Sequence, residues 1–104
     1  MSIEETEYLI VYPGHNTALL LYRRLLKRSC FVELVSTPIK ISYGCSQAVK
    51  FNEIYLDTIN EEVLKINIRP KGIYKIDKSG RIDKYEKVWF IALRIWNSQI
   101  LYYL

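Results

Sequence analysis

The sequence has few cysteines, histidines and glycines, and each shortage excludes a class of protein. Its 104 residues include two cysteines, one histidine and four glycines. Two cysteines are too few for a disulfide-rich scaffold. Cys30 and Cys45 form neither a CxxC motif nor a Cys/His spacing, so no metal site is expected. The glycines form no phosphate-binding loop, which argues against a nucleotide, and we expect no cofactor.

We expect neither a secretory leader nor a membrane-spanning segment in this sequence. Residues 1–7, MSIEETE, are acidic and polar, unlike a signal peptide. The apolar stretch at residues 88–104 is interrupted by Arg94 and by the polar residues 97–99, which makes it a poor transmembrane helix. We therefore expect a cytoplasmic protein with no membrane partner, in which both thiols stay reduced.

Basic residues outnumber acidic ones and give the chain a formal net charge of +4. Much of the excess lies in YRRLLKR, residues 22–28, which we interpret as the end of a helix. Cations at that position oppose the negative end of the helix dipole. The chain has no base-stacking motif and no recognition-helix signature. The basic charge thus has a local structural explanation, and we do not expect nucleic acid as a partner.

Half of the residues are hydrophobic and a quarter are charged, proportions typical of a single globular domain. β-Branched and aromatic residues at positions 8–12 predict a strand that ends at Pro13 and Gly14. Residues 30–36, 47–51 and 71–77 predict three more strands. Apolar residues recur at helical spacing in residues 16–28, with Asn16 as the expected N-cap.

A second helix is expected over residues 52–67. Either Asn52 caps it, or Thr58 and Glu61 form a capping box at a later start. The order of elements is then β-α-β-β-α-β. It predicts an α+β protein with a ferredoxin-like sandwich, in which a four-stranded sheet carries both helices on one face. This fold hosts many functions and does not by itself indicate one.

We expect a domain over residues 1–77 and an apolar C-terminal extension over residues 78–104. The extension has two interpretations: a helix, or a hairpin that turns at Asn97 and Ser98. The helix would present one apolar face, made of Trp89, Leu93, Trp96, Ile100 and Tyr103. In either form the extension is apolar enough to cover the open face of the sheet or to form a homodimer interface.

One stretch of the chain resembles a known family. The order of strand, turn and helix at residues 8–28 is followed by a strand ending in Thr-Pro, then Ile-Ser, a cysteine, and a strand ending in Lys-Phe. The matching residues are Thr37, Pro38, Ile41, Ser42, Cys45, Ala48, Lys50, Phe51, Gly72, Ile73 and Tyr74. This pattern, over residues 7–77, resembles the selenium/sulfur carrier protein-like family, small bacterial domains that also occur fused to TusA/SirA-type sulfur-carrier domains.

The resemblance implies that Cys45 is a thiol that accepts sulfur or selenium and passes it on. Lys40, Lys50 and His15 are the residues that we expect to tune this thiol, because nearby cations favour the thiolate. The implied partners are proteins that donate and accept sulfur or selenium. The chain would be a carrier and not an enzyme with turnover of its own. Cys30 is expected to be a structural residue.

Two features depart from the family pattern. Ile39 and Lys40 stand where the family has Arg-Glu, and Ser46 replaces the glycine that follows the cysteine. A second hypothesis does not involve the thiol: the chain would be an interaction module that dimerises or docks through its aromatic C-terminal extension. The two hypotheses differ in whether Cys45 must be reactive.

Overall fold

Apolar β-branched and aromatic residues form the central strand, β1 (Glu7–Tyr12), in the computed structural model, which describes residues 6–42 and 46–88. Around β1 the chain forms seven further elements: α1 (His15–Lys27), β2 (Glu33–Ser36), β3 (Gln47–Asn52), the 3-10 turn η1 (Glu53–Tyr55), α2 (Leu56–Ile66), β4 (Gly72–Asp77) and β5 (Lys84–Val88). The strands make one sheet in the order β2-β3-β1-β4-β5. Every neighbouring pair is antiparallel.

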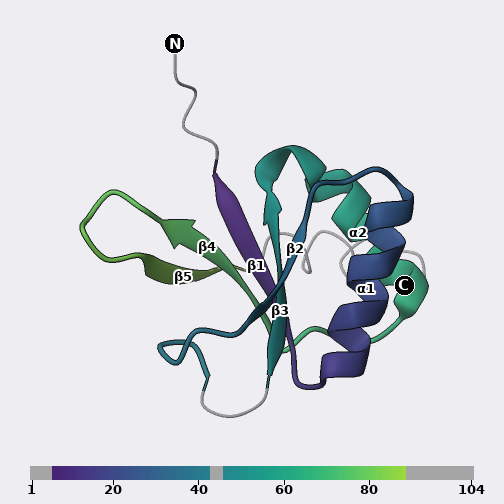
Figure 1. The fold of residues 1–104 in the computed structure, drawn as a ribbon, viewed down its shortest axis with the longest axis horizontal. Coiled ribbons are helices and arrows are strands. Elements are labelled where there is room, and N and C mark those ends of the chain that lie inside the picture. Colours follow the sequence, from purple (N-terminus) through teal and green to yellow (C-terminus); the bar gives the residue numbers. More distant parts are fainter. Residues whose placement is uncertain (1–5, 43–45, 89–104) are drawn as a thin grey trace, which may run out of the picture.

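Both α-helices cover the same face of the sheet (Figure 1). Their apolar sides pack on residues that point toward them from β1, β3 and β4, and this set forms the larger core. Its fully buried members include Ile10, Tyr12, Leu21, Leu25, Val49, Phe51 and Ile59. The predicted α+β class, with two helices on one face of an antiparallel sheet, is therefore confirmed.

The sheet has five strands where the sequence predicts four. β5 pairs with β4 along its whole length, from Ile73 opposite Val88 to Asp77 opposite Lys84. Residues 84–88, KYEKV, are mostly charged because β5 lies at the edge of the sheet, where charged side chains remain in solvent. Its hydrophobic signal is consequently weak. The first part of the expected C-terminal extension thus forms a strand of the sheet.

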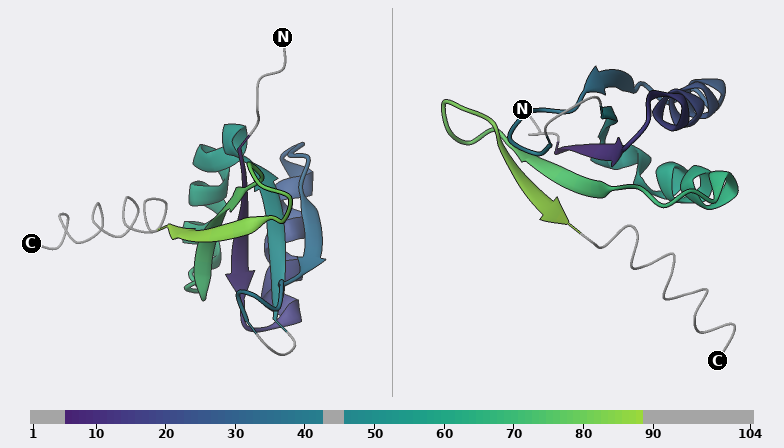
Figure 2. Two further views of the ribbon diagram at one scale, coloured as in Figure 1. Left: turned by 90° about the vertical axis from the view of Figure 1, so that its left-hand side faces the viewer. Right: turned by 90° about the horizontal axis from the view of Figure 1, so that it is seen from below.

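The face opposite the helices is also partly covered. Leu9, Val11, Ala48 and Ile76 form a second, smaller core there, with Ile41 among the half-buried residues packed against it. The connection between β2 and β3 and the hairpin of β4 and β5 both project on this side (Figures 1 and 2). The open face predicted from the sequence is therefore filled in part by Ile41 of the β2–β3 connection and by Tyr85, which belongs to the first part of the C-terminal extension.

Element boundaries differ from the sequence prediction, notably at the starts of α1 and β2. α1 begins at His15, with Gly14 as an extended N-cap, and not at Asn16. β2 begins at Glu33 and not at Cys30. The Asn52 prediction is confirmed in part: its Oδ1 accepts a hydrogen bond from the Ile54 N–H at 2.9 Å and so caps η1, which leads into α2.

Among residues 6–42 and 46–88, no helix has the length and hydropathy that crossing a membrane requires. Residues 89–104, which include Trp89, Leu93, Trp96, Ile100 and Tyr103, lie outside the described residues. The expectation of a helix or hairpin in this part of the chain, and of a homodimer interface, therefore stays a prediction.

Candidate functional site

One end of the sheet collects the segments that contain the predicted site residues. β1 ends at Tyr12, opposite Gln47, the first residue of β3. β2 ends at Ser36, also opposite Gln47. β4 starts with Gly72, which lies opposite Val11 near the end of β1. We call this the loop end of the sheet, because the β1–α1 turn, the β2–β3 connection and the start of β4 all meet there (Figure 1).

Cys45 itself lies outside the described residues, and its chain neighbour Ser46 is the first described residue after it. The Ser46 carbonyl accepts a hydrogen bond from the Thr37 N–H at 3.3 Å, which continues the pairing of β2 with β3. Both side chains are buried, and among residues 6–42 and 46–88 neither hydroxyl has a hydrogen-bond partner. The described part of the chain thus leaves two buried hydroxyls at the base of the β2–β3 connection without a partner.

His15 is exposed and is the first residue of α1. It follows the end of β1, so it lies at the same end of the sheet as Ser46. The sequence did not decide this point, because either end of the sheet could have carried the β1–α1 turn. His15 and the β2–β3 connection are thus brought to one end of the molecule.

The two predicted lysines have partners elsewhere. Lys40 Nζ donates a hydrogen bond to the Asp83 carbonyl at 3.2 Å, across to the β4–β5 hairpin. Lys50 lies inside β3, and its Nζ is 3.7 Å from a carboxylate oxygen of Glu33. Lys50 is four positions from Ser46 along extended chain, a rise of about 13 Å. Lys50 therefore lies well away from the loop end.

Lys71 is a cation at the loop end that the sequence analysis missed. Its backbone N–H donates to the Val11 carbonyl at 2.7 Å, and its Nζ donates to Ser42 Oγ at 2.9 Å. β3 and β4 are both antiparallel to β1, so they run in the same direction and start at the same end. The predicted strand order could have identified Lys71, because the residue before β4 must then lie at the same end of the sheet as the residues before β3.

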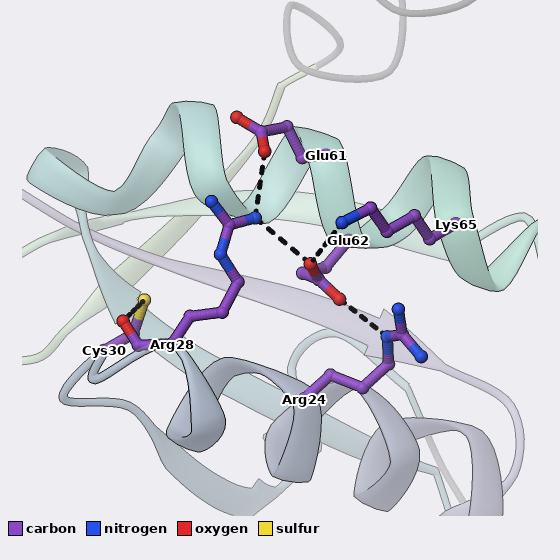
Figure 3. A network of polar contacts seen from close by, with 6 residues as sticks. All are labelled: Arg24, Arg28, Cys30, Glu61, Glu62 and Lys65. Carbon is purple, nitrogen blue, oxygen red and sulfur yellow. Dashed lines mark hydrogen bonds and ion pairs between the residues drawn. The ribbon is translucent and has the colours of Figure 1, made fainter.

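Cys30 has surroundings that suppress reactivity. The residue is 4% exposed, and its Sγ lies 3.9 Å from the Arg28 carbonyl (Figure 3). Burial raises the pKa of the Cys30 thiol; the Arg28 charge opposes this shift and the Glu62 charge adds to it. A thiol that stays protonated at neutral pH is a poor nucleophile. These surroundings fit the structural role expected for Cys30.

A buried carboxylate joins the two helices close to Cys30. Arg24 Nε donates to Glu62 at 2.6 Å, Arg28 Nη1 donates to it at 3.1 Å, and Lys65 Nζ lies 3.5 Å away (Figure 3). Arg28 also reaches Glu61 at 2.9 Å. Burial raises the pKa of Glu62, but the hydrogen bonds from Arg24 and Arg28 outweigh it, and the pKa is lowered. The arginines therefore connect α1 to α2.

This network was not expected from the sequence, which assigned the cations of residues 22–28 to the helix dipole. Every acceptor oxygen of Glu62 is occupied by a cation of the chain itself. A carboxylate held in this way is neither a free base nor a free ligand. We therefore assign the network to stabilising the fold. In the described part of the chain, no three His, Cys, Asp or Glu side chains are grouped as a metal site requires.

Comparison with known proteins gives one match. A model of the family described as "Putative Se/S carrier protein-like" matches residues 7–75. The matched segment contains β1 to β3, both helices and most of β4, together with Cys45, Lys71 and His15. No curated protein and no solved structure matches the chain.

Proposed function

The chain belongs to the Se/S carrier protein-like family, and from this membership we propose that Cys45 carries sulfur or selenium between partner proteins. The observation that supports this most directly is the burial of Cys30, the other cysteine of the chain. Cys30 is buried, and its pKa is raised. Cys45 belongs to the connection between β2 and β3, inside the segment that matches the family. We therefore propose Cys45 as the thiol that carries the sulfur or selenium.

The transfer step needs no redox cofactor. The Cys45 thiolate attacks the outer sulfur of a donor persulfide, R–S–SH, forming an S–S bond while the donor's own S–S bond breaks. The donor leaves as the thiolate R–S⁻, and Cys45 becomes Cys45–S–SH. An acceptor thiolate then takes the outer sulfur in the same way and restores Cys45. Selenium transfer follows the same scheme with selenium as the outer atom.

The tuning residues that we propose are His15, Lys40, Lys50 and Lys71. Cations favour a thiolate in proportion to their proximity. Lys71 is supported by its hydrogen bond to Ser42, three residues before Cys45. His15 is supported by its place at the loop end. Lys40 belongs to the same connection as Cys45, whereas Lys50 has the weakest support because it pairs with Glu33.

The partners that we propose are a protein that supplies sulfur or selenium and a protein that receives it. A carrier thiol must be reduced before loading, so we place the protein in the cytoplasm. We further propose that the domain is a ferredoxin-like sandwich extended by one strand. The order β2-β3-β1-β4 and the two helices on one face support this assignment, and β5 is the addition.

The test is persulfide loading of the whole protein. Wild type, Cys45→Ser and Cys30→Ser are incubated with glutathione persulfide, alkylated and mapped by peptide mass spectrometry. We expect wild type and Cys30→Ser to gain the mass of one sulfur on Cys45 and to release it to a dithiol. Cys45→Ser should gain none. Loading of Cys45→Ser to the wild-type extent would contradict the proposal and leave the thiol-independent interaction module.

A further inference from the structure

A shallow groove lies between two segments that are far apart in the sequence. Pro38, Ile39 and Lys40 form one wall, from the β2–β3 connection. The other wall comes from the β4–β5 hairpin and consists of Arg81, Ile82, Asp83 and Tyr85. The volume of the groove is about 480 Å³. The two segments project together on the side of the sheet away from the helices (Figure 2).

The walls of the groove are held in place by hydrogen bonds and by the core. Lys40 Nζ donates to the Asp83 carbonyl at 3.2 Å, which ties one wall to the other. The Pro38 carbonyl accepts hydrogen bonds from the Ile41 and Ser42 N–H groups, which closes a turn in the connection. Ile41 and Tyr85 pack on the smaller core. Such a groove is formed before a partner binds, so little ordering entropy opposes binding.

The groove presents apolar surface to solvent. Ile39 is 70% exposed and Ile82 is 66% exposed, although each is a large aliphatic residue. A single exposed isoleucine is ordinary on a protein surface. Two of them, from separate segments, line the same groove and form its apolar patch.

The charge of the groove indicates what kind of partner fits. Lys40 and Arg81 are cations, and Asp83 is the single carboxylate. Lys40 bonds to a neutral carbonyl, so its charge is not cancelled by that contact. Arg81 has no ion pair with any residue that the structure describes. An acidic segment with apolar side chains would complement both the charge and the patch.

We propose that this groove docks an acidic, apolar segment of the protein that exchanges sulfur or selenium with Cys45. The partner's role rests on the proposed function, whereas its chemistry rests on the groove. Pro38, Ile39 and Lys40 belong to the same connection as Cys45, and Lys40 is five positions from it. A partner segment held by this wall is held by the loop that carries the thiol.

Binding is tested on the full chain with two fluorescein-labelled peptides, an Asp-Leu repeat and a Lys-Leu repeat of equal length. We expect fluorescence anisotropy to show binding of the Asp-Leu peptide, weakening as salt increases. The double substitution Ile39→Ser and Ile82→Ser should weaken binding about tenfold or more. Arg81→Glu should reverse the preference between the peptides. Ile54→Ser removes an isoleucine that is 74% exposed but lies outside the groove, and it should change nothing.

Three results would overturn the proposal. The first is equal binding of both peptides, and the second is an equal effect of Ile54→Ser and of the double substitution. The third is self-association of the wild-type chain in sedimentation that the double substitution abolishes, because a second copy would then occupy the groove. Persulfide loading of Cys45 is measured on the same samples. A wild-type chain that takes up no sulfur refutes the carrier function, while the anisotropy result still decides the groove.

Discussion

At the scale of single residues, Cys30 shows how burial lowers the reactivity of a thiol. It belongs to the larger apolar core, and its Sγ lies 3.9 Å from the Arg28 carbonyl. Removing the thiol from water costs more for the thiolate than for the neutral form. The nearby Arg28 charge does not reverse that balance, and the pKa stays raised.

Cys30 should therefore react much more slowly than Cys45 with iodoacetamide in the folded protein at neutral pH. Burial limits access, and the raised pKa keeps the thiolate fraction small. Rates are read from peptide mass spectra of quenched samples, with the urea-unfolded chain as the control in which the two rates converge. Equal rates in the folded state would contradict this account.

Lys71 offers a second test at this scale. Lys71→Gln should raise the pKa of the Cys45 thiol, because it removes a positive charge from the loop end. Lys27→Gln is the matched control, since that lysine lies in the last turn of α1, at the end of the helix away from the loop end. The pKa is read from the pH dependence of the alkylation rate. A Lys71→Gln curve that overlays the wild-type curve would remove Lys71 from the site.

At the scale of elements, the two helices are joined by a charge network as well as by apolar packing. Arg24, in the last turn of α1, and Arg28, the C-cap residue of that helix, are four positions apart, so both side chains can reach the same carboxylate on α2. Glu62 is 2% exposed, and a buried charge is tolerated only when it is paired and hydrogen-bonded. The network thus fixes how α2 lies against α1.

Glu62→Gln should lower the free energy of unfolding by about 2 kcal/mol, because charged hydrogen bonds to a buried group are replaced by weaker neutral ones. Glu61→Gln, which alters an exposed pair with Arg28, is the matched control and should have little effect. Urea titration followed by circular dichroism gives both values. A similar loss for the two variants would mean that burial of Glu62 is not what matters.

Gly72 begins β4 beneath the ring of Tyr74. A Cβ at position 72 would lie 2.8 Å from Tyr74 Cε1, so the ring must move. Gly72→Ala should destabilise the protein by roughly 1 kcal/mol through this overpacking. In a Tyr74→Ala background the same change should cost clearly less. A double-mutant cycle in urea measures the coupling, and additive effects would contradict the proposed contact.

At the scale of the whole molecule, the Glu62 network makes the free energy of unfolding depend on pH in the acidic range. The folded-state pKa of Glu62 lies below its ordinary value of 4.5. The unfolded chain therefore takes up a proton more readily than the folded one as pH falls. The stability that this carboxylate contributes is present above about pH 4.5 and is lost as the pH falls through the folded-state pKa.

We expect the melting temperature of wild type to fall below pH 4.5 more steeply than that of Glu62→Gln. The variant has no titratable group at position 62, so its stability lacks this contribution at every pH. Thermal unfolding by calorimetry between pH 3 and 7 compares the two curves. Parallel curves would show that another carboxylate controls the acid response.

The sequence predicted the elements that have strong apolar patterns and missed the contacts that depend on tertiary structure. The apolar runs around β1, β3 and α1 predicted the order of the first six main elements and the α+β class. β5 was not predicted because it lies at the edge of the sheet, where its mostly charged side chains give only a weak apolar pattern. The ion pairs of Glu62 were not predicted because its arginine partners are 34 and 38 residues away in the sequence. Helical periodicity carries no information about such distant pairs. Cys45 came from the family resemblance and not from its pattern.

The order of strands in the sheet also constrains how the chain can be made. β1 leaves the ribosome first, yet its neighbours in the sheet are β3 and β4. β2, the next strand to be synthesised, is separated from it by β3 and cannot pair with it. The five buried residues of β1 therefore stay unpaired in the nascent chain until β3 has emerged, and one edge stays open until β4 follows. Early exposure of such a strand favours aggregation, so the nascent chain is most prone to aggregate before β3 and β4 have emerged.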